Sequence, residues 1–401
     1  MSVLYNSSSM HNSIEQAHDE LLQWCRRHNF AGFDPFDALN SRVLQSTSLT
    51  RSRTARLIST QLIKRSPLNL RRLARIPEQK NSKGIALFAL AGLSNYRRLK
   101  TRETEKEARE LLDELLRMQI VGYSGAAWGY NFDWQSRHFF APQGTPMIVP
   151  TAFAARALFD AYETLKDNKY LETALSSCEF ILKDLKRTAV DNNDGELCFS
   201  YSPLDETKVF NASLFAAETL ACSGEFQGKT EFNDLAVRAA RYVVRRQNED
   251  GSWAYGAGPG QLWVDNFHTA YVLLSLSRIM KCLPGGEIEF KPALQRGYRF
   301  WRERFFLADG WPKYYHDTLY PADAHAAATA IVTLIELREL DSDALSLAET
   351  IADWTIRNLR DSRGFFYYQR RRFYTVRTPF MRWTQAWMLY ALARLSEVKT
   401  L

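Results

Sequence analysis

A unit of about 55 residues recurs along the chain, and this repeat restricts the possible folds more than any other feature of the sequence. Each unit contains an apolar helix rich in small residues, a polar connection, an amphipathic helix, and a loop with glycine and aromatic residues. The apolar helices are predicted to begin near Lys83, Thr151, Asn211, Asn266, Asp323 and Arg382. Apolar residues on most of their faces suit helices that pack on several sides, so they are predicted to form an inner ring.

The amphipathic partners have apolar residues at the three- and four-residue spacing of one helical face. They are predicted over 103–118, 169–185, 231–246, 292–305 and 345–359, and residues 14–27 supply the same pattern near the N-terminus. Pairing the C-terminal helix with 14–27 would close a ring of six helical hairpins. The sequence therefore predicts an all-α fold, an (α/α)₆ toroid, as a single domain over 1–401. A basic helical insertion is expected at about 42–82, with its helix near 54–64.

Composition narrows the class of protein. Hydrophobic residues make up 46% of the chain and charged residues 24%, a globular balance, and no segment reaches the ~18 uninterrupted apolar residues of a membrane span. The N-terminus lacks the pattern of a secretory signal, and the five cysteines form no CxxC pair, so we expect a cytoplasmic protein without a zinc site. Neither a metal nor a cofactor is predicted.

The net charge of +7 is concentrated between 42 and 83, where Glu78 is the only acidic residue. Such a segment can contact anionic glycans or lipid phosphates, or it can be a solvated helical face. Without a stacking motif or a recognition-helix pattern beside the charge, no nucleic acid partner is predicted.

In the predicted ring the N-termini of the inner helices converge on one rim, where unpaired backbone N–H groups favour anionic ligands. The candidate catalytic residues at this rim are Asp133, Asp265, His268, Asp323 and His325. The candidate substrate-binding residues are Tyr130, Trp134, Arg137, Tyr201, Trp253, Tyr255, Lys313, Tyr314, Tyr368 and Arg382. Aromatic faces that stack on sugar rings, carboxylates that act as acid and base, and cations that read acidic sugars make this mixture typical of a carbohydrate site.

Each of these residues also has a structural interpretation. Asp265 and Asp323 stand where helix N-caps belong, and aromatics that follow a glycine can simply plug the end of a barrel. His268 and His325 each follow one of these Asp residues at similar places in successive repeats, which favours a role in proton transfer. Asp133 lies in the densest cluster, Trp128 to Arg137, and leads into a long loop.

Two resemblances accompany the repeat. The stretch from Gln247 through Gly251 to Trp253 resembles the QxxxGxW motif of squalene-hopene and oxidosqualene cyclases, which form α-toroids, but their acidic DxDD motif does not occur in this chain. A broader similarity rests on GFDPFDALNSR, WGYNFDWQSR, FSYSPLD, VVRRQNEDGSWAYG, DNFHTAYVL and DGWPKYYHDTLYPADAH. These segments resemble VpsJ-type proteins of surface-polysaccharide gene clusters, which implies a six-hairpin toroid related to glycosidases, polysaccharide lyases and terpenoid cyclases.

The residues and the resemblance together predict a carbohydrate-active enzyme of surface or exopolysaccharide biosynthesis, with a sugar or oligosaccharide as substrate. The first hypothesis is glycoside hydrolysis by rim carboxylates, with an acidic sugar as a sub-hypothesis. The second is a uronate lyase or sugar epimerase that uses a His or Tyr base. The third is a non-catalytic glycan-binding or assembly protein, associated with the polysaccharide-synthesis machinery or a membrane surface, and a prenyl-lipid enzyme is a distant fourth.

Overall fold

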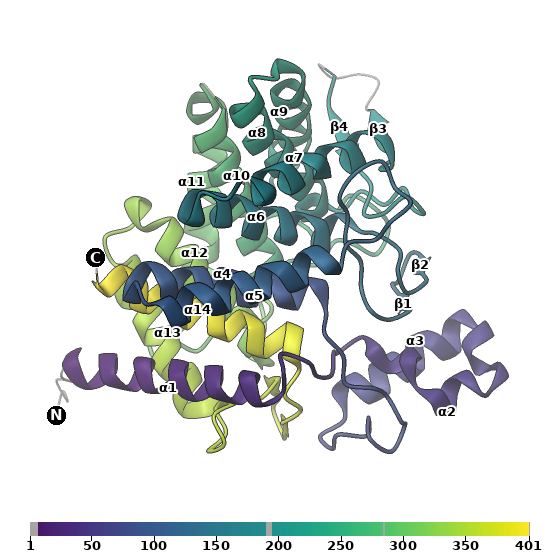
Figure 1. Ribbon diagram of the computed structural model, residues 1–401, viewed down its shortest axis with the longest axis vertical. Coiled ribbons are helices and arrows are strands. Elements are labelled where there is room, and N and C mark those ends of the chain that lie inside the picture. Colours follow the sequence, from purple (N-terminus) through teal and green to yellow (C-terminus); the bar gives the residue numbers. More distant parts are fainter. Residues whose placement is uncertain (1–6, 190–194, 284, 401) are drawn as a thin grey trace.

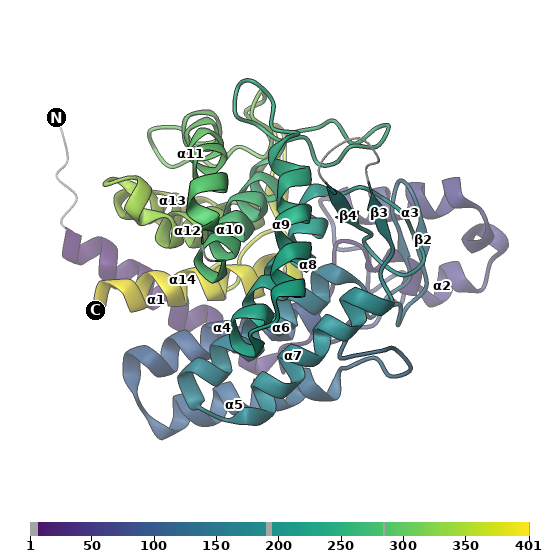
Figure 2. The ribbon, with the colours of Figure 1, turned by 90° about the horizontal axis from the view of Figure 1, so that it is seen from above.

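The computed structural model describes residues 7–189, 195–283 and 285–400, which form two concentric rings of helices (Figures 1 and 2). The inner ring contains α4 (Ser82–Leu99), α6 (Ile148–Leu165), α8 (Phe210–Gln227), α10 (Asn266–Cys282), α12 (Ala324–Glu336) and α14 (Ala386–Thr400). The outer ring contains α5 (Arg102–Arg117), α7 (Asn168–Lys183), α9 (Thr230–Val244), α11 (Gly286–Arg304), α13 (Ala344–Leu359) and α1 (Ser7–Arg27). Each inner helix packs against its two inner neighbours, and α14 packs against α4, so the ring is closed.

The two rings follow from the two helix patterns. In α4, residues 82–95 are all buried, as expected for a helix with neighbours on several sides, and a Cβ at Gly92 would lie 3.3 Å from the Cα of Ala108 on α5. In α5 only one stripe is buried, made of Ala108, Leu111, Leu112 and Leu115. Burial of each leucine side chain contributes about 1.5–3 kcal/mol, so the inner surface of the outer ring stabilises each hairpin.

The end of the ring is closed by contacts between segments that lie far apart in the sequence. Arg360 at the end of α13 pairs with Glu20 of α1. Gly364 has a φ of +97° and its Cα faces the Glu20 carbonyl, where a Cβ would come within 2.8 Å of the oxygen. Only glycine fits this turn without strain. The predicted pairing of the C-terminal helix with the N-terminal one is confirmed by the packing of α1 on α14.

The predicted all-α (α/α)₆ toroid is thus confirmed, and most predicted helix boundaries agree with the structure within a few residues. The main difference is α11, which was expected to begin at Pro292 but begins at Gly286, so that Pro292 lies inside the helix. Pro292 is the seventh residue of α11, beyond the first turn that proline favours, so it lacks the N–H that would bond to the Ile288 carbonyl, and the helix continues through it. No described helix combines the length and the apolar character that crossing a membrane would require.

Short strands join the hairpins at the rim. They are β1 (Trp134–Gln135) with β2 (Phe140–Ala141), β3 (Arg187–Ala189) with β4 (Leu197–Phe199), and the three-stranded sheet of β5 (Ala322–Asp323), β6 (Gln369–Arg370) and β7 (Thr375–Val376). All three sheets are antiparallel. Short 3₁₀ segments, η1 (Asp37–Asn40), η2 (Ser48–Arg51) and η3 (Arg338–Leu340), and a π-helical turn, η4 (Met381–Gln385), complete the described elements.

The predicted insertion at about 42–82 contains α2 (Arg42–Gln45), η2 and α3 (Arg53–Arg65) and follows directly on η1; it projects from one side of the toroid (Figures 1 and 2). Its base is fixed by Arg71, whose fully buried guanidinium pairs with Asp37 at 2.9 Å and donates to the Asp34 carbonyl. Arg71 also lies 4.4 Å from the centre of the Phe380 ring. Part of the basic charge in this segment therefore anchors the insertion instead of facing solvent.

Candidate active site at the rim of the inner helices

The N-termini of the inner helices meet at one rim of the ring, as the sequence predicts. Side chains cap three of these helices, because Asn81, Asp265 and Asp323 accept hydrogen bonds from backbone N–H groups of the first turn. Capping fixes the orientation of the residues that follow, and these carry titratable groups aimed at the rim: Lys83, His268 and His325. The rim is therefore built from caps and from the side chains that the caps orient.

Asp265 and His268 form the sharpest pair at this rim. Asp265 Oδ2 lies 2.7 Å from His268 Nδ1 and accepts a second hydrogen bond, at 3.0 Å, from the Trp263 indole. Because a carboxylate can only accept, Nδ1 carries the hydrogen and Nε2 is the basic nitrogen. The Asp265 side chain is 1% exposed and that of His268 is 22% exposed, so the base faces solvent while the acid that orients it does not.

Aromatic rings form a wall beside His268. Tyr255 stacks on Trp263 with ring centres 4.4 Å apart and planes at 15°, and the Tyr255 ring lies 4.5 Å from His268. The guanidinium of Arg137 lies 5.2 Å from the centre of the Trp263 ring. A flat aromatic surface beside a base and a cation is suited to a sugar ring that carries polar or charged groups.

A second chain of polar groups lies deeper in the ring. His325 Nδ1 donates to the Trp383 carbonyl at 2.9 Å, and the Tyr271 hydroxyl donates to His325 Nε2 at 2.8 Å. Lys83 Nζ donates to the same hydroxyl at 3.3 Å. Burial is the main cause that lowers the pKa of both Lys83 and His325 well below their ordinary values, so His325 is held neutral.

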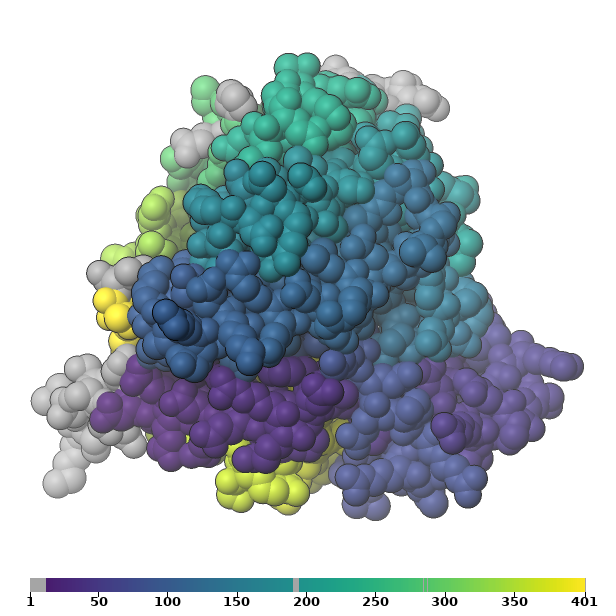
Figure 3. All heavy atoms as spheres, viewed as in Figure 1, coloured from purple at the N-terminus to yellow at the C-terminus, as the bar shows by residue number. Residues whose placement is uncertain are grey.

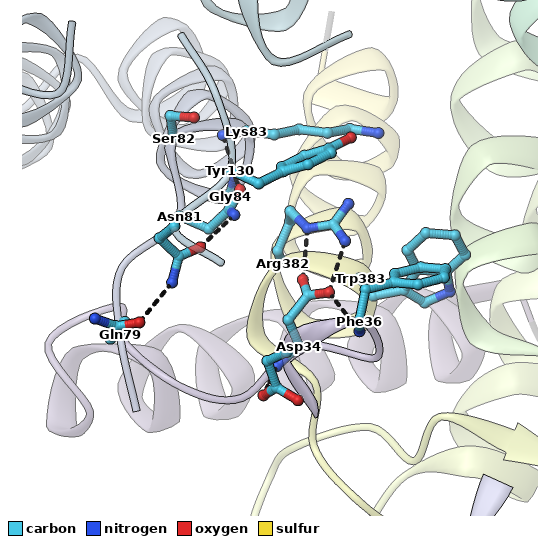
Figure 4. Close-up of polar contacts among 12 residues, drawn as sticks. Asp34, Phe36, Gln79, Asn81, Ser82, Lys83, Gly84, Tyr130, Arg382 and Trp383 are labelled. Carbon is cyan, nitrogen blue, oxygen red and sulfur yellow. Dashed lines mark hydrogen bonds and ion pairs between the residues drawn. The ribbon is translucent and has the colours of Figure 1, made fainter. Parts of the chain in front are cut away.

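Asp34 and Arg382 form a buried ion pair between the segment after α1 and η4 (Figure 4). The two bonds measure 2.6 and 2.8 Å, and the arginine lies 4.9 Å from the centre of the Tyr130 ring. The Tyr130 hydroxyl lies 3.5 Å from that of Tyr201, which packs in turn on Trp134. The predicted substrate-binding residues on this side thus meet in one cluster, but Arg382 has a fixed carboxylate partner.

Asp323 caps α12 from a fully buried position, and its second oxygen accepts from the Gln369 amide. Burial raises the pKa of Asp323 to about 6. Lys64 of α3 lies nearby, with Nζ 4.1 Å from the centre of the Phe36 ring and 6.0 Å from that of Tyr368. Burial lowers the pKa of Lys64 to about 7. Tyr314 contacts Phe267, with ring centres 5.6 Å apart, and its backbone accepts from the Asn266 N–H and donates to the Pro321 carbonyl.

Three predicted residues are not brought to this cluster. Trp253 is buried under α11, where a Cβ on Gly297 would overlap its ring, and its indole donates to the Val243 carbonyl. Asp133 accepts from the backbone N–H of Gln143 at 2.8 Å and so joins the segment before β1 to the segment after β2. Lys313 turns its ammonium toward the His316 carbonyl at 2.8 Å. These three side chains are engaged in local packing or in hydrogen bonds to the backbone. Their positions in the sequence repeat do not indicate these contacts.

A cavity of about 840 Å³ opens at the opposite end of the ring, among the C-terminal halves of the inner helices. Its charged lining is cross-linked, since Glu218 pairs with Arg156 and Arg278, and Arg278 also pairs with Glu336. Phe153 and Trp387 line this cavity, and both rings pack against Tyr271 below the rim. This aromatic layer separates the cavity from the rim.

Lys83, Tyr271 and Trp263 are rim residues that the sequence does not single out. Lys83 follows the cap Asn81 by two positions, as His325 follows Asp323, and this shared spacing is a signal that could have found it. Tyr271 lies about one turn after His268 on α10, where the sequence pattern indicates only an apolar helical face. Its role depends on contacts with five other helices, α4, α6, α8, α12 and α14.

Comparison with solved structures supports the fold. An unsaturated glucuronyl hydrolase specific for heparin aligns with a TM-score of 0.63 at 14% identity, over 99% of this chain and 99% of that chain. The cellobiose 2-epimerase of Bacillus thermoamylovorans has a TM-score of 0.62 at 12% identity, over 81% of this chain and 90% of that one. A family 76 α-mannanase of Bacteroides thetaiotaomicron has a TM-score of 0.62 at 13% identity, over 81% and 88%.

No family model matches the sequence, and no curated protein matches it. At these identities the structural likeness bears on the architecture alone. The chain shares its (α/α)₆ toroid with proteins whose names describe sugar epimerases and glycoside hydrolases.

Proposed function

We propose that the chain is a carbohydrate-active enzyme whose rim transfers a proton at a carbon of a sugar, as an epimerase or a lyase does. The observation that carries this proposal is the 2.7 Å contact between Asp265 and the partly exposed His268. It orients the imidazole with Nε2 available to substrate. The fold shared with a sugar epimerase agrees with this reaction class.

In this reaction His268 Nε2 removes a proton from a carbon next to a carbonyl or carboxylate group. Asp265 acts as a positioning residue, because it holds the Nδ1 hydrogen and stabilises the imidazolium that forms. Negative charge that develops on the substrate is favoured by the nearby N-termini of the inner helices and by Arg137. Protonation of the same carbon on the opposite face by a solvent proton, while His268 passes its own proton to solvent, gives an epimer. Departure of a leaving group, which takes up a proton, from the neighbouring carbon gives an unsaturated sugar.

Hydrolysis is the second candidate, and the raised pKa of Asp323, about 6, is the observation that favours it. A glycosidase needs two carboxyl groups on either side of the scissile bond. The rim carboxylates are each engaged: Asp34 with Arg382, Asp265 with His268, and Asp323 with a helix cap and Gln369. Proton transfer by His268 leaves all of these carboxylate contacts intact. Hydrolysis requires at least one of the carboxyl groups to break its present contacts and face the glycosidic bond.

The surface-polysaccharide context implied by the sequence resemblance belongs to the same proposal, as does an acidic sugar substrate. Arg137 is exposed at the rim, where its guanidinium lies 5.2 Å from the centre of the Trp263 ring. The acidic substrate would be supported if uronate oligosaccharides bound more tightly than neutral ones and if their affinity fell as the salt concentration rose. Equal affinity for both classes of oligosaccharide, without salt dependence, would contradict the hypothesis of an acidic sugar substrate.

The test is isotope exchange in D₂O with cellobiose and with a heparin disaccharide, followed by NMR. The wild type should place deuterium at C2 or C5, while His268→Gln and Asp265→Asn should each lose about 10²–10⁴-fold in exchange rate. His138→Gln is the matched control, because His138 is exposed outside the cluster and should exchange at the wild-type rate.

Three outcomes would contradict the proposal. New reducing ends without deuterium at carbon would indicate hydrolysis. Equal exchange in wild type and both variants would exclude the Asp265–His268 pair. Sugar binding by wild type without any turnover would favour a non-catalytic glycan-binding protein.

A further inference from the structure

The insertion carries an unusual set of exposed apolar side chains. They range from 48% exposed for Val43 to 80% for Leu73, and the set is completed by Leu49, Ile58, Leu62 and Leu68. Isolated exposed leucines are ordinary, but six in about thirty residues form a concentration that soluble surfaces rarely leave uncovered. The insertion that carries them projects from the toroid, as Figures 1 and 3 show.

The exposure is a consequence of how α3 is seated. Its inner face is anchored, because Arg56 donates to the Gln135 amide at 2.7 Å and lies 4.4 Å from the Phe140 ring centre, Thr60 is buried, and Lys64 enters the rim. Ile58 and Leu62 are one turn apart and share the opposite face. These two side chains therefore point away from the protein along a single stripe of a fixed helix.

A second element extends this surface. The turn between β6 and β7 exposes Phe373 at 85%, and the hydroxyl of the neighbouring Tyr374 donates to the Arg65 carbonyl at the end of α3 at 3.2 Å. Arg372 is exposed beside Phe373, with its guanidinium 5.2 Å from the centre of the Phe373 ring. The hydrogen bond places the tip of the hairpin next to the insertion.

The charge around these apolar residues has one sign. No acidic residue occurs between 42 and 77, and the exposed basic residues of that stretch are Arg42, Arg51, Arg53, Arg65, Arg72 and Arg75. Leucine, isoleucine and phenylalanine side chains gain free energy when they enter the acyl boundary of a bilayer, and arginine gains from anionic headgroups. A nucleic acid or a soluble polyanion would use the arginines but would leave the apolar side chains in water.

We propose that the insertion and the β6–β7 turn form a docking surface for an anionic lipid bilayer. The membrane-docking surface comprises Leu49, Ile58, Leu62, Leu68, Leu73 and Phe373, which enter the headgroup region, with the exposed arginines around them. Since α3 carries Lys64 into the rim on its inner face, docking holds the rim beside the membrane. The interaction is peripheral and does not depend on the reaction proposed above.

The test is co-sedimentation of the full chain with two kinds of vesicle, phosphatidylcholine alone and phosphatidylcholine mixed with phosphatidylglycerol. The wild type should bind the mixed vesicles at low salt and be released as salt increases. Leu62→Ser/Leu73→Ser/Phe373→Ser should lower binding about 100-fold, because three inserted apolar side chains are lost. Arg51→Glu/Arg72→Glu/Arg372→Glu should lower it at least as much on the mixed vesicles.

Val121→Ser/Ile288→Ser is the matched apolar control, because these residues are 89% and 87% exposed outside the insertion and the turn. It should bind vesicles like the wild type, and unchanged melting temperatures should show that all variants fold. The proposal would be overturned if the wild type failed to bind mixed vesicles, or if the control lost as much binding as the apolar variant. It would also be overturned if only the arginine variant lost binding, since that result indicates a soluble polyanion such as an acidic polysaccharide.

Discussion

Removing one partner of the Asp34–Arg382 ion pair should destabilise the protein far more than removing an exposed pair. The side chains are 6% and 4% exposed, and the two bonds measure 2.6 and 2.8 Å. Arg382→Met leaves a buried carboxylate without its cation, and Asp34→Asn leaves a buried guanidinium without its anion. Loss of one partner of such a pair costs about 3–5 kcal/mol in the free energy of unfolding.

The measurement is urea unfolding at neutral pH, with the free energy of unfolding taken from the midpoint and slope. Arg117→Met is the control, because its pair with Glu114 is 66% and 24% exposed and should contribute about 0–1 kcal/mol. The double variant Asp34→Leu/Arg382→Met should recover much of the loss, since it leaves no buried charge unpaired. Single-variant costs below about 1 kcal/mol would refute the claim that this pair joins the segment after α1 to η4.

Three further predictions follow from buried groups. Trp253→Phe should lower stability by about 1–2 kcal/mol, because the buried hydrogen bond from the indole to the Val243 carbonyl is lost while that carbonyl keeps its bond from the Arg246 N–H, and it should leave turnover unchanged; reduced turnover in a stable variant would argue against a packing role. Gly310→Ala should cost at least ~1 kcal/mol in thermal unfolding, because φ is +88° and the Cβ would lie 2.5 Å from the Thr350 carbonyl oxygen; an unchanged melting temperature would contradict the geometry. The pKa of Lys64 falls from 10.5 to about 7 on folding, so the folded chain binds fewer protons between these values and stability should rise with pH across that window. Lys64→Met should therefore be more stable by about 1–2 kcal/mol at and below pH ~7, with the difference gone near pH ~10.5, and a constant difference at all pH values would contradict this assignment.

The helices and their order could be predicted because both depend on periodic local patterns. Apolar residues on all sides distinguish α4 from the amphipathic α5, and the unpaired pattern at 14–27 predicts how the ring closes. The start of α11 could not be predicted from Pro292, because proline is favoured in the first turn of a helix but here occupies the seventh position, inside the helix.

Rim residues that stand next to a helix N-cap could be predicted from the sequence. Rim residues whose position depends on packing between helices could not. Asp265 and His268 are close in the sequence, so their contact within one turn of α10 follows from local geometry. Lys83 and Tyr271 meet across the ring, and no local pattern specifies that contact. Arg71 gives the opposite case, since it lies in a basic segment that suggests a solvated face yet is fully buried against Asp37.

The central claim is that sugar binds at the rim beside His268 and not in the cavity at the opposite end. A crystal of the wild type soaked with cellobiose tests this claim most directly. We predict a sugar ring against Tyr255 and Trp263, with a carbon that bears an acidic hydrogen about 3–3.5 Å from His268 Nε2. Sugar bound among Arg156, Glu218 and Arg278 instead, with the rim unchanged, would contradict the account.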